Sequence, residues 1–209
     1  LPDHSCQPLR WLLHLPAFAD EMNKSRAIVA QQARQLAEQG WAVLIPDLYG
    51  CGDSAGDLSA ARWPLWQQDL CKLIGLLQQL GVERLSLWGL RLGCLLVLPL
   101  LRSSPLAIER LILWQPLLDG QRAMTQFLRL RTAAGLTGGA TETLDHLREY
   151  LQCEQQLEVA GYNLPLPLLL AIEAESLMSV GALVTLTARD QPLSVEWLEV
   201  ARQPERGLL

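Results

Sequence analysis

The stretch Ser86-Leu87-Trp88-Gly89-Leu90-Arg91-Leu92-Gly93 contains the turn that decides the fold. Residues 84–88 form a short apolar run of strand type, and the apolar residues 92–101 are typical of a buried helix. A glycine on each side of a sharp turn lets the backbone bend tightly and lets the helix pack close to the strand. The spacing alone also fits an ordinary strand-to-helix turn, so the surrounding segments must decide its meaning.

Other apolar runs of similar length also predict buried strands. They are residues 10–15, 41–45 and 110–114, each followed closely by a proline. Strands of this kind that alternate with helical segments are typical of a parallel, doubly wound sheet. We therefore expect one α/β domain that comprises all 209 residues.

The intervening segments have helical spacing and recognisable ends. Between the first two strands, apolar residues recur at helical intervals, Ser25 is a candidate N-cap, and Gly40 stands where a helix-ending glycine is expected. Pro64 suits the first turn of the next helix, and Gly81 closes it. Each helix thus joins two strands of the predicted sheet.

The alternation of predicted strands and helices stops after Asp119. Residues 121–134 and 141–152 are predicted to be helices joined by a glycine-rich turn, without a core strand between them. We interpret residues 120–178 as a helical lid inserted into the domain. Residues 182–187 and 195–200 are the last predicted strands.

Charge and composition exclude some classes of partner. The formal net charge is −5, the pI is near 5.2, and the arginines are scattered singly, so no basic stripe is available for nucleic acid. The longest apolar run has ten residues, whereas a membrane span needs about 20. We expect neither a nucleic-acid partner nor a membrane span.

The cysteines indicate a reducing compartment. Five cysteines are widely spaced, without a C-x-x-C pair or a nearby histidine at metal-ligand spacing. No signal-peptide pattern opens the chain. We therefore predict a cytoplasmic protein without a metal or another cofactor.

Two loops place the turn at residues 88–93 in a known context. Residues 47–54, Asp-Leu-Tyr-Gly-Cys-Gly-Asp-Ser, resemble the D-x-x-G-x-G-x-S loop common among α/β hydrolases. Residues 13–18 are similar to the His-Gly loop that donates an oxyanion-hole amide in those enzymes, although Leu15 replaces the glycine. The turn itself then corresponds to the G-x-S-x-G nucleophile elbow. The resemblance implies an α/β-hydrolase fold in which Arg91 stands at the serine position.

Longer strings point to one subfamily. Residues 18–26, Phe-Ala-Asp-Glu-Met-Asn-Lys-Ser-Arg, together with residues 88–93, 114–116 and 159–162, resemble the exosortase A system-associated hydrolase 2 family. That resemblance implies a bacterial protein encoded beside exosortase and exopolysaccharide genes. It does not imply a substrate, because function depends on the groups at the site.

Those groups do not form a serine triad. In this fold the catalytic histidine comes last in chain order, but His4 and His14 precede the elbow and His146 lies in the predicted lid. A guanidinium is neither a nucleophile nor a base at neutral pH. The chain also starts near the third strand of the usual fold and stops near the last one. Truncation at both ends therefore stays open.

Arg91 has two possible roles. In the first, Arg91 and the Leu92 amide bind an acidic group in the former oxyanion pocket, since helix N-termini and guanidinium groups both favour anions. In the second, Arg91 pairs with a local carboxylate and stiffens an inactive pocket. Glu21 is the preferred partner, ahead of Asp20 and Asp119, because its loop follows the strand next to the elbow.

The remaining polar candidates also have structural alternatives. Phe18, Asn23 and Lys24 are candidates for the pocket, although Asn23, Lys24 and Ser25 could instead cap a helix. Ser54 is more readily a turn-stabilising hydroxyl than a displaced nucleophile. Cys94 and Ser86 are expected to be core residues, as are most of the tryptophans, although Trp88 and Trp114 end adjacent strands near the pocket.

Three functions remain open. The first is a hydrolase-derived protein that binds or processes an acyl or saccharide-related ligand without a serine triad. The second is a non-catalytic module that recruits a protein partner of the same system. The third, a hydrolase disabled only by truncation, is disfavoured because restoring a nucleophile does not restore its base and acid.

Overall fold

The computed structural model describes residues 10–138, 142–177 and 193–199. Its main sheet is parallel, has the strand order β2-β1-β3-β4-β7, and confirms the predicted α/β-hydrolase fold class. The predicted strand at 182–187 lies outside the described residues. The main-sheet strands are β1 (Arg10–Leu15), β2 (Trp41–Leu44), β3 (Arg84–Leu90), β4 (Ala107–Trp114) and β7 (Ser194–Leu198).

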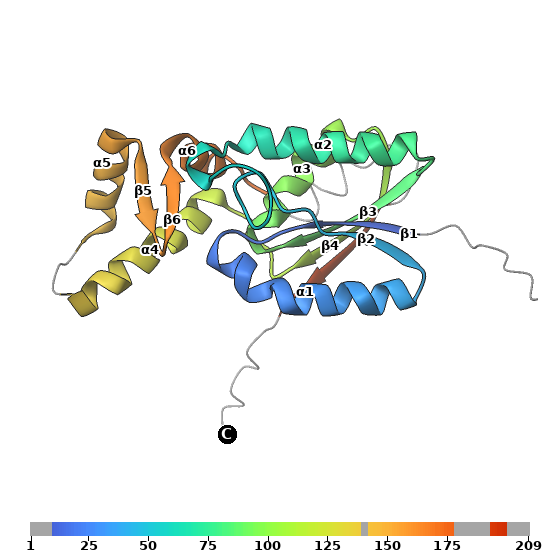
Figure 1. Ribbon diagram of the computed structural model, residues 1–209, viewed down its shortest axis with the longest axis horizontal. Helices are drawn as coiled ribbons and strands as arrows, with labels where there is room; N and C mark the ends of the chain where they lie inside the picture. Colours follow the sequence, from blue (N-terminus) through green and yellow to red (C-terminus); the bar gives the residue numbers. More distant parts are fainter. Residues whose placement is uncertain (1–9, 139–141, 178–192, 200–209) are drawn as a thin grey trace, which may run out of the picture.

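Helices cover both faces of this sheet. Helix α1 (Asp20–Glu38) lies on one face, and α2 (Trp63–Gln79) and α3 (Val97–Ser103) lie on the other (Figure 1). Successive side chains of a strand point to opposite faces of the sheet, so Leu13 and Leu15 belong to one core cluster and Leu12 to the other. None of the helices within the described ranges combines the length and hydropathy that a bilayer crossing requires.

The predicted ends of the first two helices are mostly right. Pro64 lies in the first turn of α2, and Gly40 and Gly81 follow α1 and α2 with positive φ. The predicted cap at Ser25 is wrong, because α1 already begins at Asp20 and the Ser25 hydroxyl donates to the Met22 carbonyl at 3.0 Å. The polar first turn hides this start from a search for apolar spacing.

The turn at residues 88–93 has the geometry that its glycines predict. Strand β3 extends to Leu90, and the chain then enters a 3₁₀ helix, η2 (Arg91–Leu96), before α3. A Cβ atom on Gly93 would stand 2.2 Å from the Leu15 carbonyl oxygen, and one on Gly89 would stand 2.9 Å from Cys94 Sγ. Gly93 therefore permits η2 to pack directly against the end of β1, and Gly89 permits it to pack against β3.

The single helix predicted for residues 92–101 is divided in two. Residues up to Leu96 form the 3₁₀ helix, and α3 begins at Val97. Pro99 accounts for the position of this start. A proline lacks the N–H that a helix interior needs, but it is tolerated in the first turn.

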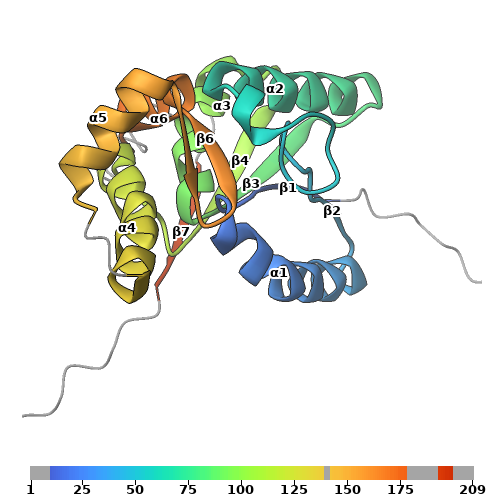
Figure 2. The same ribbon diagram turned by 60° about the vertical axis from the view of Figure 1, so that its left-hand side comes forward.

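The segment after Asp119 lies beyond the carboxyl edge of the sheet (Figures 1 and 2). We call residues 120–138 and 142–177 the cap. It contains a two-stranded antiparallel hairpin that the helical prediction missed, turned by Ala160 and Gly161, both with positive φ. Its elements are α4 (Gly120–Gly138), α5 (Leu144–Glu154), β5 (Gln156–Val159), β6 (Tyr162–Pro165) and α6 (Leu166–Glu173).

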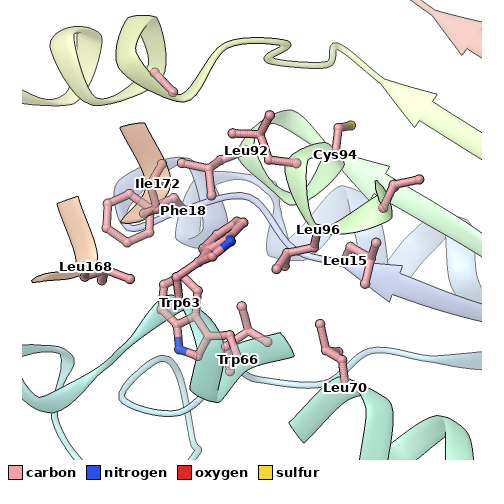
Figure 3. Close-up of a cluster of buried hydrophobic side chains, with 14 of the residues drawn as sticks. Leu15, Phe18, Trp63, Trp66, Leu70, Leu92, Cys94, Leu96, Leu168 and Ile172 are labelled. Atoms are coloured by element: carbon pink, nitrogen blue, oxygen red, sulfur yellow. The ribbon is translucent and has the colours of Figure 1, made fainter. Parts of the chain in front are cut away.

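The cap and the sheet share one hydrophobic core. Phe18, in the loop after β1, has its ring 5.0 Å from that of Phe127 in α4 and 6.1 Å from that of Trp66 in α2. Figure 3 shows side chains from this loop, α2, η2 and α6 converging in one cluster. Burial of aromatic rings on this scale anchors the cap firmly on the sheet.

Candidate functional site

Arg91 lies at the carboxyl edge of the sheet, at the tip of the turn between β3 and η2. Its φ is +53°, and two other non-glycine residues with positive φ, Ala19 and Gln115, follow the neighbouring strands β1 and β4. The Arg91 Nη1 group donates to the Gln115 carbonyl at 3.3 Å, and the Leu117 amide donates to the Arg91 carbonyl at 3.2 Å. Non-glycine residues with such rarely populated backbone conformations are concentrated at functional sites.

The predicted ion pair between Arg91 and Glu21 is present. Arg91 Nε and Nη2 lie 3.0 Å and 2.9 Å from Glu21 Oε1, with the side chains 28% and 45% exposed. The two alternative partners are engaged elsewhere, because Asp20 pairs with Lys24 and Asp119 accepts from the Arg122 amide. The Arg91 side chain is therefore held in place by Glu21, and both side chains of the pair stay partly exposed to solvent.

A cavity of about 260 Å³ lies beside this pair, between the sheet edge and the cap. The predicted site residues Phe18, Glu21, Lys24 and Leu92 line it. Arg91 and Asn23 do not line it; Arg91 adjoins it through Glu21. Its apolar wall is completed by Leu117 and by the cap residues Ala123, Met124, Phe127 and Leu130.

The first turns of α1 connect this site to the other distinctive loops. Asn23 Nδ2 donates to the Tyr162 hydroxyl at 2.6 Å, and Arg26 Nη2 donates to Asp47 Oδ1 at 2.6 Å. Burial opposes ionisation of Asp47, but hydrogen bonds from Arg26 and the Asp53 amide outweigh it and lower its pKa. One short helical segment thus holds the elbow, the cap hairpin and the loop after β2.

The described residues do not provide an activated nucleophile. No hydrogen bond joins a serine, threonine or cysteine to a histidine ring in residues 10–138, 142–177 and 193–199. His146 is exposed on α5, whereas burial lowers the pKa of His14 to about 4. Cys94 is buried, and that burial raises its pKa to about 12, so it is an inert core thiol as predicted. Ser54 contributes its amide to a turn, donating to the Cys51 carbonyl at 3.1 Å.

A comparison with protein families agrees with the α/β-hydrolase fold. A family model described as serine aminopeptidase, S33, matches residues 18–170, which include the elbow and much of the cap. The chain belongs to this family of α/β hydrolases. No match was found among curated proteins.

Solved structures share the fold at low sequence identity. A protein of Agrobacterium vitis S4, named only as a hydrolase, has a TM-score of 0.60 and 13% sequence identity to this chain. The matched region covers 92% of this chain and 80% of the Agrobacterium protein. Est1E of Butyrivibrio proteoclasticus, solved with ferulic acid bound, has a TM-score of 0.55 and 19% sequence identity. The matched region covers 93% of this chain and 79% of Est1E. Mouse α/β hydrolase domain-containing protein 10 has a TM-score of 0.50 and 17% identity. This chain spans 60% of the mouse protein's length, and 78% of this chain is covered.

Part of the site could not be found from the sequence. In the sequence, Gln115 stands out only as part of residues 114–116, which resemble the subfamily, and nothing in a sequence predicts the positive φ of Ala19. Met124 and Phe127 reach the cavity because the cap lies across the sheet edge, and the position of an inserted segment does not follow from helical spacing.

We expect the Arg91–Glu21 pair to contribute a measurable coupling. In a double-mutant cycle with Arg91→Met and Glu21→Gln, the coupling should be about 0.5–1 kcal/mol and should fall at high salt, because the pair is partly exposed. Urea unfolding of the four proteins measures it. The Asp20–Lys24 pair, 38% and 75% exposed at i,i+4 spacing, is the matched control and should give a smaller value. Equal couplings in the two cycles would contradict the expectation.

Proposed function

We propose that the chain is an α/β-hydrolase-family protein in which Arg91 occupies the nucleophile position. In this proposal it binds a ligand with an apolar acyl or saccharide-related part and an acidic group, and does not run serine-triad hydrolysis. The observation that carries the proposal is the juxtaposition of the Arg91–Glu21 pair and a largely apolar cavity. An apolar pocket with a few convergent polar groups is the usual form of a small-molecule site.

Arg91 suits an acidic group because its fork is already held in place. Three of its five N–H groups face Glu21 and the Gln115 carbonyl, which leaves donors for a ligand oxygen. Leu92 lies at the beginning of η2, where a helix has N–H groups without an intrahelical acceptor. A bound carboxylate would share Arg91 with Glu21 and would meet the Leu92 amide.

The shared guanidinium gives a sharp test. Octanoate is the probe and octanol the uncharged comparison, both titrated by calorimetry. We expect Arg91→Met to weaken octanoate binding and Glu21→Gln to strengthen it, since removal of the competing carboxylate frees Arg91. Octanol binding should change little in either variant. If each variant changed the affinities for octanoate and octanol by the same factor, the Arg91–Glu21 pair would have only a structural role.

We expect no turnover of p-nitrophenyl acetate or butyrate above the buffer rate. Arg91→Ser should also be inactive, because the two histidines in the described part of the chain lie elsewhere, His14 against Trp88 and His146 exposed on α5, and neither is placed to take a serine proton at position 91. Initial rates followed by absorbance measure this, with Ser54→Ala as a control. Any turnover by the wild-type protein would contradict the proposal, and turnover that survives both Arg91→Ala and Ser54→Ala would indicate another nucleophile.

We infer the biological setting from the resemblance of residues 18–26 to the exosortase A-associated family. On that basis the protein is bacterial and cytoplasmic and serves an exopolysaccharide system. The free thiols of Cys51, Cys71, Cys94 and Cys153 agree with a reducing compartment. A coding region that lies far from exosortase and exopolysaccharide genes would contradict this inference.

A second candidate function is a non-catalytic interaction module. Leu130, Tyr150 and Leu170, from the three cap helices, are 42%, 46% and 52% exposed. This function requires that they contact a partner as one patch, because single exposed apolar side chains are ordinary on protein surfaces. Cross-linking in extracts that yields a product sensitive to Leu170→Asp and indifferent to Arg91→Met would favour this function.

A further inference from the structure

A second cavity, of about 190 Å³, lies between α1, the end of β1 and the loop after β2. It is separate from the cavity beside Glu21, because the two share no lining residue. Val29, Ala30 and Ile45 supply apolar surface, and His14, Arg26 and Asp47 supply polar groups. The proposed function uses none of these residues.

His14 is the unusual member of this cavity. It is only 2% exposed, its ring lies 4.4 Å from that of Trp88, and its Nδ1 has no hydrogen-bond partner in the structure. A buried polar atom without a partner costs stability, and native proteins seldom leave one unsatisfied. His14 also lines the second cavity, so a ligand bound there would lie next to this ring.

The electrostatics of the cavity favour a neutral partner. Arg26 and Asp47 form an ion pair, and His14 is uncharged near pH 7 because burial lowers its pKa more than a backbone hydrogen bond at Trp88 raises it. An unpaired ligand charge would find no net countercharge there. Hydroxyl groups can both donate to and accept from an imidazole, a guanidinium and a carboxylate.

The size of the cavity limits the ligand. A volume of about 190 Å³ corresponds to roughly six water molecules in the liquid. Its apolar wall suits the C–H face of a small carbon chain. We propose that this cavity binds a neutral, hydroxyl-rich small molecule of the size of a short polyol, with one hydroxyl on His14 and others on the Arg26–Asp47 pair.

The test must observe His14 itself, because polyols at high concentration stabilise proteins without binding to a site. Glycerol, erythritol and xylitol are titrated into the full chain while the imidazole ¹⁵N signals are recorded by NMR. We expect saturable shifts of the His14 nitrogens with at least one polyol and none with acetate or 1-butanol. His146, exposed on α5, is the internal reference and should not respond.

Two variants with matched controls complete the test. Ala30→Leu fills the cavity and should weaken polyol binding at least tenfold, read from cavity methyl signals, whereas Ala27→Leu on the exposed side of α1 should not. His14→Phe removes the hydrogen bond and should weaken binding by a similar factor; His146→Phe should have no effect. Absence of saturable His14 shifts for all three polyols, or binding unchanged in Ala30→Leu, overturns the proposal.

Discussion

Alanine at position 93 is expected to cost the folded state about 3 kcal/mol or more, among the largest effects of any single methyl group in this chain. The added Cβ would stand 2.2 Å from the Leu15 carbonyl oxygen and 2.5 Å from that of Pro16. Both atoms are backbone at the end of a central strand, so they cannot rotate away. Relief requires η2 to move off β1, and that movement displaces Arg91 and Leu92 as well.

Urea unfolding followed by far-UV circular dichroism measures this cost. The matched control is Gly75→Ala in the middle of α2, where an added Cβ meets nothing within 4 Å. That control should gain about 0.5–1 kcal/mol, because alanine is the better helix former. A Gly93→Ala protein that unfolds at the wild-type urea concentration would show that η2 is not packed against β1 as described.

Stability is expected to fall by about 3 kcal/mol between pH 7 and pH 4 through His14 alone. Burial lowers the pKa of this histidine from its ordinary value of 6.5 to about 4. Between these two values the unfolded chain binds a proton that the folded protein does not bind. Acidification through this window therefore favours the unfolded state, and the His14 contribution levels off below about pH 4.

The variant His14→Phe isolates this effect. Carboxylates with a lowered pKa, such as Asp47, also reduce stability in acid, but they titrate in both proteins and cancel in the difference. The free energy of unfolding, measured from pH 7.5 to pH 4, should fall less steeply in the variant. His146→Phe, a substitution of an exposed histidine, is the matched control. Parallel curves for wild type and His14→Phe would show that folding does not lower the pKa of His14.

The fold was predictable because its signals are local and repeated. Each predicted strand up to Trp114 is present, and the elbow glycines have the close contacts that their positions predict. The Arg91–Glu21 pair was also predictable, since parallel neighbours end at the same edge of a sheet. Adjacent strands therefore bring their following loops together.

The missed features depend on tertiary packing. The helix start at Asp20 is set by Met22, which is buried, and by an acidic first turn, not by a side-chain cap. The hairpin at Ala160 needs a positive φ in a residue that rarely adopts it. The cavity at His14 arises where α1 crosses β1 and the loop after β2, and no spacing along the chain encodes that volume.

The contacts of residues 21–26 limit how this scaffold can be recombined. Glu21, Asn23 and Arg26 contact partners in three segments that are distant in the sequence, namely the elbow, the cap hairpin and the loop after β2. A chimera that imports any one of those segments from another hydrolase would leave a donor or a charge on α1 without its partner. Successful grafts must therefore exchange the first turns of α1 together with the imported segment.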